Sequence, residues 1–115
     1  MIENEFIREL RSSLTELLAL MDKKTLRIVF PELHAYMVNR AVSSMFLMYT
    51  KLRENVITDT DTNALDALMM GLAGGAYDVH LAHHQEELRA SIGSALVCLD
   101  TLEQDLRGDD NVPVN

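Results

Sequence analysis

The sequence predicts an all-α protein: a compact bundle of four main helices, which we expect to form a dimer. Leu, Ala and seven Met dominate the apolar residues, Trp is absent, and aromatic residues make up only 5% of the 115. Such residues form helices well and fill irregular cores. Only five Gly and two Pro occur, so the turn clusters that an all-β chain needs are missing. Apolar residues also recur at steps of three and four, the period of a helix.

The first helix is expected to run from the opening residues to about Met21. Its apolar stripe consists of Ile7, Leu10, Leu14, Leu17 and Met21. Residues 25–30 are expected to add one short helical turn. Pro31 disfavours the helical conformation at Phe30 and fits the first turn of a new helix. The second helix is therefore predicted from about Pro31 to Arg53.

Apolar residues occupy most of the circumference of this second helix. They are Leu33, Met37, Val38, Ala41, Val42, Met45, Phe46, Leu47, Met48, Tyr49 and Leu52. A helix that is apolar nearly all round is expected to be buried on several sides.

Residues 55–63 predict a loop that ends in a helix N-cap, with Asp61 or Thr62 as the capping residue. The third helix is predicted over residues 62–82 with two apolar faces, one of large residues and one of small residues that include Gly71, Gly74 and Gly75. Each glycine costs a helix roughly 1 kcal/mol relative to Ala. Close packing against another helix, within the chain or across a dimer, would offset that cost. The alternative is a helix break at Gly74 and Gly75.

A heptad pattern predicts the fourth helix, which should end near Gly108. Its members are Leu88, Ile92, Ala95, Leu99, Leu102 and Leu106. This register does not continue that of the third helix, so we expect a break near residues 80–85. Residues 1–108 are expected to form a single domain, and residues 109–115 a disordered acidic tail.

The net charge of −8 is unevenly distributed along the chain. Residues 1–53 contain 8 basic and 6 acidic residues, whereas residues 54–115 contain 2 basic and 12 acidic residues. An acidic surface repels phosphate backbones, so we expect no direct binding to nucleic acid and favour a protein partner with a basic surface. The simpler interpretation is that the acidic residues only keep the protein in solution.

The single Cys98 lies in an apolar run, where a buried, unreactive thiol is expected. The acidic start of the chain does not resemble a signal peptide, and no apolar run reaches the roughly 20 residues that span a bilayer. We therefore expect a cytoplasmic protein that does not bind membranes and needs no cofactor.

One histidine cluster suggests chemistry. His80 and His84 lie four residues apart and Glu87 three beyond His84, so on one helix their side chains would point to one side and could bind a transition metal. A solvated polar surface is the more ordinary interpretation. Arg27 and His34 have a spacing that some helical ribonucleases use, but a lone pair of this kind is too common to assign catalysis.

From these patterns we expect a non-enzymatic protein-binding regulator, inhibitor or chaperone-like adaptor. The candidate binding residues are the acidic Asp78, Glu86 and Glu87 and the small Gly71, Gly74 and Gly75. The alternatives are a metal-binding or catalytic bundle that uses His80, His84 and Glu87, and a structural assembly subunit.

Overall fold

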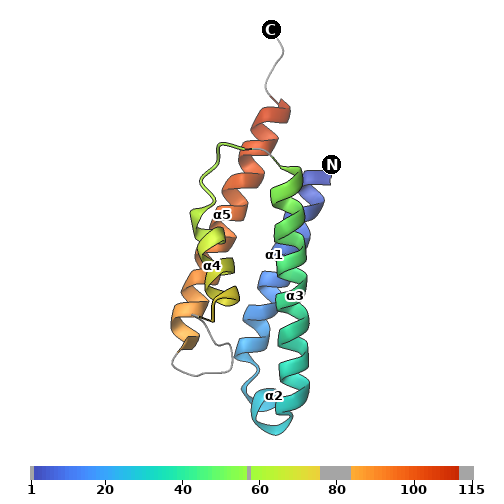
Figure 1. Ribbon diagram of the computed structural model, residues 1–115, viewed down its shortest axis with the longest axis vertical. Helices are drawn as coiled ribbons and strands as arrows, with labels where there is room; N and C mark the ends of the chain where they lie inside the picture. Colours follow the sequence, from blue (N-terminus) through green and yellow to red (C-terminus); the bar gives the residue numbers. More distant parts are fainter. Residues whose placement is uncertain (1, 57, 76–83, 112–115) are drawn as a thin grey trace.

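The computed structural model describes residues 2–56, 58–75 and 84–111, and places most of them in helices (Figure 1). The helices are α1 (Ile2–Asp22), α2 (Lys24–Val29), α3 (Pro31–Asn55), α4 (Asn63–Ala73) and α5 (Gln85–Asn111). No strand occurs within these described ranges. The prediction of four main helices with a short extra turn before Pro31 is confirmed.

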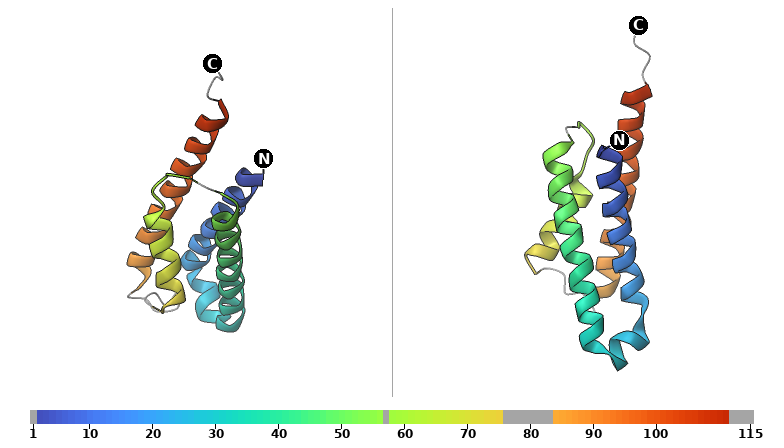
Figure 2. Two further views of the ribbon diagram at one scale, coloured as in Figure 1. Left: turned by 45° about the horizontal axis from the view of Figure 1, so that its top comes forward. Right: turned by 90° about the vertical axis from the view of Figure 1, so that its right-hand side faces the viewer.

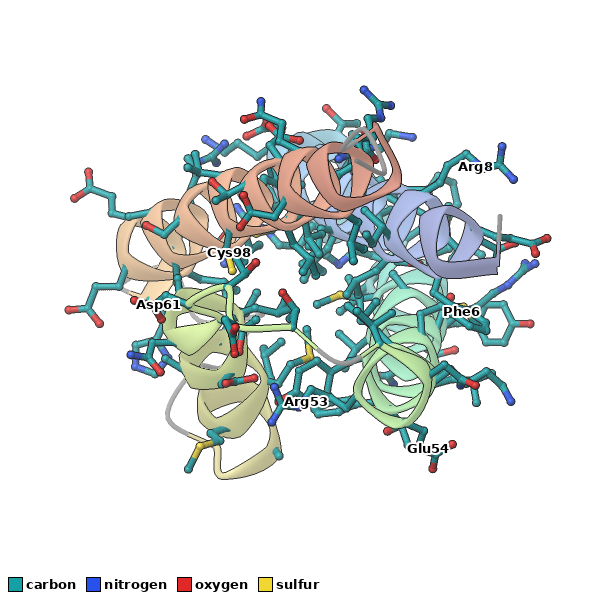
Figure 3. The ribbon with its side chains drawn as sticks, turned by 90° about the horizontal axis from the view of Figure 1, so that it is seen from above. Phe6, Arg8, Arg53, Glu54, Asp61 and Cys98 are labelled. Atoms are coloured by element: carbon teal, nitrogen blue, oxygen red, sulfur yellow. The ribbon has the colours of Figure 1, made fainter. Side chains whose placement is uncertain are left out.

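The four main helices alternate in direction along the bundle, and α2 forms a corner at one end (Figures 1 and 2). Helix α1 packs against both α3 and α5, and α4 packs against α5. Helices α3 and α4 follow each other in the sequence but approach closely at few backbone positions. Seen along the bundle, their ribbons lie apart and side chains occupy the space between them (Figure 3).

One apolar core joins α1, α3, α4 and α5. Its fully buried members include Ile7, Leu10, Leu14, Leu17, Met45, Leu65, Leu68, Leu88, Ile92 and Leu99. Each such side chain contributes about 1.5–3 kcal/mol when it leaves water. The apolar stripes predicted for the first and fourth helices therefore coincide with the core.

Helix α3 buries one stripe of side chains. The stripe consists of His34, Val38, Ala41, Met45 and Leu52. Five more residues of the predicted apolar set are partly buried against the core, so α3 is covered over a wide face: Met37, Val42, Phe46, Met48 and Tyr49. Leu33 and Leu47 of that set are exposed by half or more of their surface, as is Tyr36. Tyr49 donates a hydrogen bond to Asp66 of α4. Leu33 and Leu47 lie on nearly the opposite side of α3 from Tyr49, so they point away from α4.

Helix α4 begins as predicted but ends earlier. The Asn63 N–H donates to Asp61 Oδ1 at 2.9 Å, and the Asp66 N–H to the Thr62 carbonyl at 2.9 Å. The predicted continuation to residue 82 is wrong, because Gly74 and Gly75 form a turn in which Gly75 has φ = +77°. Left-handed backbone at a glycine is a common way for a helix to end.

Helix α4 ends at Ala73 and helix α5 begins at Gln85, so the two are separate elements. Helix α5 extends to Asn111, three residues beyond the predicted end at Gly108. Residues 76–83, where the register change is predicted, and residues 112–115 of the predicted tail lie outside the described part of the chain.

Candidate functional site

The corner between α2 and α3 exposes five large apolar side chains. Ile28, Val29, Phe30, Leu33 and Tyr36 expose between 50% and 63% of their accessible surface, and together they form what we call the corner surface. The other large apolar residues that are exposed in the described chain, Leu47, Met70 and Val97, lie on three different helices. Contiguous exposed apolar surface is typical of a site that binds something, whereas scattered exposed residues are ordinary.

The local sequence explains why these side chains are exposed. The Phe30 N–H donates to the Leu26 carbonyl at 2.9 Å and closes α2, and the His34 N–H donates to the Phe30 carbonyl at 3.0 Å and opens α3. Phe30 itself has φ = −127° and ψ = 64°, outside the helical region, because Pro31 follows it. Helix α2 is only six residues long and buries none of them completely.

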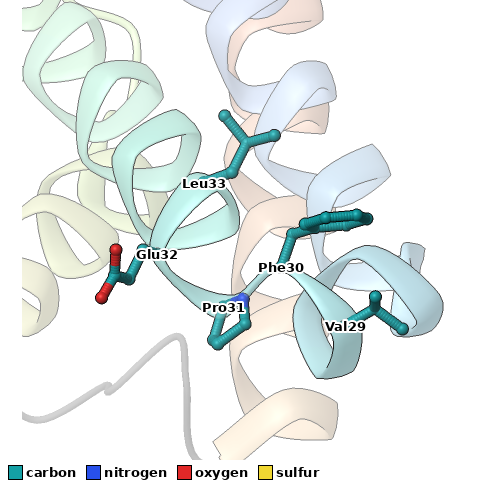
Figure 4. A pocket seen from close by; sticks show the side chains of 5 residues that line it. All are labelled: Val29, Phe30, Pro31, Glu32 and Leu33. Carbon is teal, nitrogen blue, oxygen red and sulfur yellow. The ribbon is translucent and has the colours of Figure 1, made fainter.

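A shallow, open pocket of about 410 Å³ lies on the corner surface. It is lined by Val29, Phe30, Pro31, Glu32 and Leu33 (Figure 4). Phe30 and Leu33 point to the same side of the chain, whereas Glu32 points away from them (Figure 4). The pocket is thus mainly apolar with one carboxylate on its edge.

Four cations flank the corner surface in the sequence, and we call them the cation rim. Lys23, Lys24 and Arg27 precede it in the chain, and Arg40 lies one helical turn beyond Tyr36. In the part of the chain that the structure describes, no carboxylate forms an ion pair with any of the four. Arg11, Arg89 and Arg107, by contrast, all pair with carboxylates.

His34 fixes the corner to the rest of the bundle. Its ring is only 1% exposed, and Nε2 donates to the Leu20 carbonyl near the end of α1 at 2.9 Å. Because a carbonyl can only accept, Nε2 must carry the hydrogen. His34 therefore ties two helix ends together inside the protein and does not present its ring on the surface beside Arg27.

The structure does not gather the predicted binding residues into one described site. Glu86 and Glu87 are exposed in the first turn of α5, and Gly71 is half-buried in α4. Gly74 and Gly75 are exposed in the turn after α4, and a side chain built at Gly75 would meet nothing within 4 Å. These two glycines end a helix, which is the alternative that the sequence offered to close helix packing.

Two of the predicted residues, Asp78 and the possible metal ligand His80, lie outside the described residues. His84 is half-buried just before α5, and Glu87 is exposed. The described residues contain no group of three or more His, Cys, Asp or Glu side chains arranged to hold a metal ion.

Several carboxylates of the acidic half are already engaged within the protein. Arg11 pairs with Asp100 at 2.8 Å and with Glu103 at 3.2 Å, so α1 is joined to α5 through charge. Thr60 donates to Asp105 at 2.6 Å. The acidic half is therefore not a uniform free surface, although Glu86 and Glu87 remain exposed.

A polar network that the sequence did not reveal bridges α3 and α4. Tyr49 donates to Asp66 Oδ1 at 2.5 Å, Thr62 donates to Asp66 Oδ2 at 3.0 Å, and Arg53 donates to Thr62 at 3.3 Å. Burial, and then the hydrogen bond to Asp66, raises the pKa of Tyr49 to about 12. Arg53 reaches from α3 toward the start of α4 (Figure 3). This network joins the two helices where their backbones lie apart.

Cys98 is buried, as the sequence predicts. Its thiol donates to the Asp61 carbonyl at 3.4 Å, and burial raises the pKa of the thiol. Both features keep the sulfur in its unreactive, protonated form.

The comparisons with known proteins give no match: no family model, curated protein or solved structure is significantly similar to the chain. Among the described residues, no helix combines the length and the apolar character needed to cross a membrane.

Proposed function

We propose that this chain is a non-enzymatic, protein-binding regulator or adaptor that holds its partner at the corner surface. The observation that carries the proposal is the exposure of Ile28, Val29, Phe30, Leu33 and Tyr36, of which Val29, Phe30 and Leu33 line one pocket. Large aromatic and aliphatic side chains that cluster around a pocket are the usual anchors of a protein interface. The sequence predicts the corner only as a short connecting turn, and its one signal for a site there is the run of three large apolar residues before Pro31.

Site-specific photocrosslinking tests this proposal. A benzophenone amino acid replaces Tyr36, which is 63% exposed, and in a matched control replaces Val97, which is 64% exposed on α5. Both proteins are irradiated in native lysate of the source cells. We expect a discrete adduct from position 36 and none from position 97.

The adduct should also depend on the apolar character of the corner. Adding Phe30→Ser to the position-36 protein should reduce the adduct by about tenfold, because removing an interface anchor costs more than about 1 kcal/mol. No adduct from position 36, or equal labelling from both positions, would overturn the proposal.

Dimerisation and binding to a basic protein through the exposed Glu86 and Glu87 remain further parts of the proposal. A cytoplasmic location is consistent with a chain whose single cysteine is a buried free thiol. Light scattering measures the molar mass in solution and so tests the dimer. Charge reversal of Glu86 and Glu87 tests whether these residues contribute to binding a basic protein.

A further inference from the structure

We propose that the corner surface binds an acidic segment of another protein, whose large apolar side chain enters the pocket while its carboxylates face the cation rim. This inference rests on the proposed function and adds the chemistry of the partner. The acidic half of the chain led us to expect a basic partner, whereas the basic residues at the corner favour an acidic one.

The first argument is the local charge. Although the chain has a net charge of −8, residues 22–40 contain four basic and two acidic residues. Of the two acids, Asp22 is already paired with Arg89 at 2.6 Å. Arg89 also lowers the pKa of Asp22 by its hydrogen bond, which keeps that carboxylate ionised and bound to Arg89. The exposed Glu86 and Glu87 of α5 lie within one helical turn of Arg89. Within residues 22–40, however, the four cations outnumber Glu32, the one carboxylate of this range that forms no ion pair in the described structure.

The second argument is the placement of the cations relative to the apolar side chains. Lys23, Lys24 and Arg40 are exposed, and Arg27 is half-buried beside the corner. An apolar centre with charged residues at its edge is the ordinary anatomy of an interface. The centre supplies affinity, and the charged edge selects a partner of opposite sign and speeds the encounter.

A second copy of the chain fits this surface less well. In a twofold dimer the same patch meets itself, so the cation rim of one copy would face that of the other. Like charges brought together in this way oppose association. Pairing of the corner with the acidic half of another copy would produce a reciprocal dimer, a ring or an open-ended assembly, each of which light scattering detects as self-association.

An anionic bilayer also fits less well. Its negative surface attracts basic residues, but it repels a protein with a net charge of −8. Insertion of the corner would also carry Glu32, which lines the pocket, toward the lipid headgroups. An acidic polypeptide can place its carboxylates over the cations and leave Glu32 in water.

Selection from a random peptide library tests the proposal even while the natural partner is unidentified. The probe is a displayed library of peptides of about 16 residues, about 24 Å as a helix. The baits are the intact wild-type chain, Phe30→Ala, and the charge reversal Lys23→Glu/Lys24→Glu/Arg27→Glu. The substituted side chains are exposed or half-buried, so each variant should keep the wild-type circular dichroism spectrum and unfolding midpoint.

We expect the wild-type chain to enrich peptides that combine acidic residues with an aromatic or leucine anchor. Synthetic copies of these peptides should bind at least about tenfold more weakly to Phe30→Ala and to the charge-reversed chain. Raising the salt from about 50 mM to about 500 mM should weaken wild-type binding and have little effect on the charge-reversed chain.

Different results separate this inference from the proposed function. If the peptides bind Phe30→Ala more weakly but bind the charge-reversed chain as tightly as the wild type, the partner is not acidic. The proposal that the corner binds a protein would then still stand. Peptides that need neither, or no enriched peptides, would overturn both. If the wild-type chain self-associates and Phe30→Ala abolishes this, the occupant of the corner is a second copy of the chain. If the wild-type chain co-sediments with phosphatidylserine vesicles and Phe30→Ala abolishes this, the occupant is a membrane.

Discussion

His34 connects the end of α1 to the start of α3 by donating from Nε2 to the Leu20 carbonyl at 2.9 Å. The Leu20 carbonyl also accepts from the Lys23 N–H at 3.2 Å, so His34 supplies a second donor to a carbonyl near the end of α1. The N–H of His34 thus links two helix ends, and the 1% exposure of the ring shows that this hydrogen bond forms away from water.

Replacing this histidine should destabilise the protein. His34→Ala leaves the Leu20 carbonyl without this donor and opens a cavity, so we expect a loss of about 2–4 kcal/mol in the free energy of unfolding. Substitution of the exposed neighbouring residue, Tyr36→Ala, is the matched control and should change the free energy of unfolding by less than about 0.5 kcal/mol. Urea unfolding followed by circular dichroism measures both, and equal effects would contradict this role for His34.

Tyr49 gives the protein a predictable response to alkaline pH. Burial and the hydrogen bond to Asp66 raise its pKa from 10.0 to about 12 in the folded state. The folded protein therefore keeps this proton more firmly than the unfolded chain does. The resulting stabilisation is complete below about pH 10 and is lost as the pH rises to about 12.

Comparison with Tyr49→Phe isolates this effect. The variant lacks the hydroxyl, so its stability should fall less steeply than that of the wild type between about pH 10 and about pH 12. Near neutral pH it should lose about 1 kcal/mol, because Asp66 loses a donor. Urea unfolding across this pH range makes the measurement, and parallel pH profiles would show that Tyr49 does not titrate as described.

At the scale of the elements, two glycines have opposite roles. Gly75 has φ = +77°, a conformation that a residue with a side chain adopts at a cost. Gly93 lies inside α5, and a Cβ added there would meet nothing within 4 Å. The first glycine is required by the turn that ends α4, whereas the second only weakens a helix.

Alanine substitutions should therefore change stability in opposite directions. We expect Gly75→Ala to lower the free energy of unfolding by about 1 kcal/mol and Gly93→Ala to raise it by about 0.5–1 kcal/mol. Thermal unfolding of the two variants and the wild type, run side by side, measures the difference. A Gly93→Ala protein less stable than the wild type would show that this face of α5 packs against something.

The limits of the helices follow from local sequence to different degrees. Pro31 and the apolar stripe of α1 locate the first two boundaries to within a few residues. The end of α4 at Ala73 could not be chosen from the sequence, because Gly74 and Gly75 fit either a close helix contact or a helix end. Only the three-dimensional arrangement decides which of these two local options has the lower free energy.

At the scale of the molecule, the all-α bundle was predictable and the candidate site was not. Helical periodicity reports which side of a helix is apolar, but it does not tell which apolar side meets a neighbour. Leu33 and Leu52 both belong to the apolar set of α3, yet Leu33 is exposed and Leu52 is buried. Leu52 lies on the side of α3 that packs against the core, whereas Leu33 lies on a side that is half open to solvent.

The chain therefore carries two sets of apolar residues, a core that stabilises the fold and a corner surface that is exposed. Leu17 is fully buried, so Leu17→Ala should cost about 2–5 kcal/mol in stability. Phe30 is mostly exposed, and Phe30→Ser should cost less than about 1 kcal/mol.

Binding should show the reverse order. Where Leu17→Ala remains folded, the photocrosslink from position 36 should keep its yield per folded molecule, whereas Phe30→Ser should reduce it about tenfold. Urea unfolding and quantified crosslinking on the same protein samples provide both measurements. If Phe30→Ser were as destabilising as Leu17→Ala, Phe30 would belong to the core, and its exposure could not be attributed to a partner.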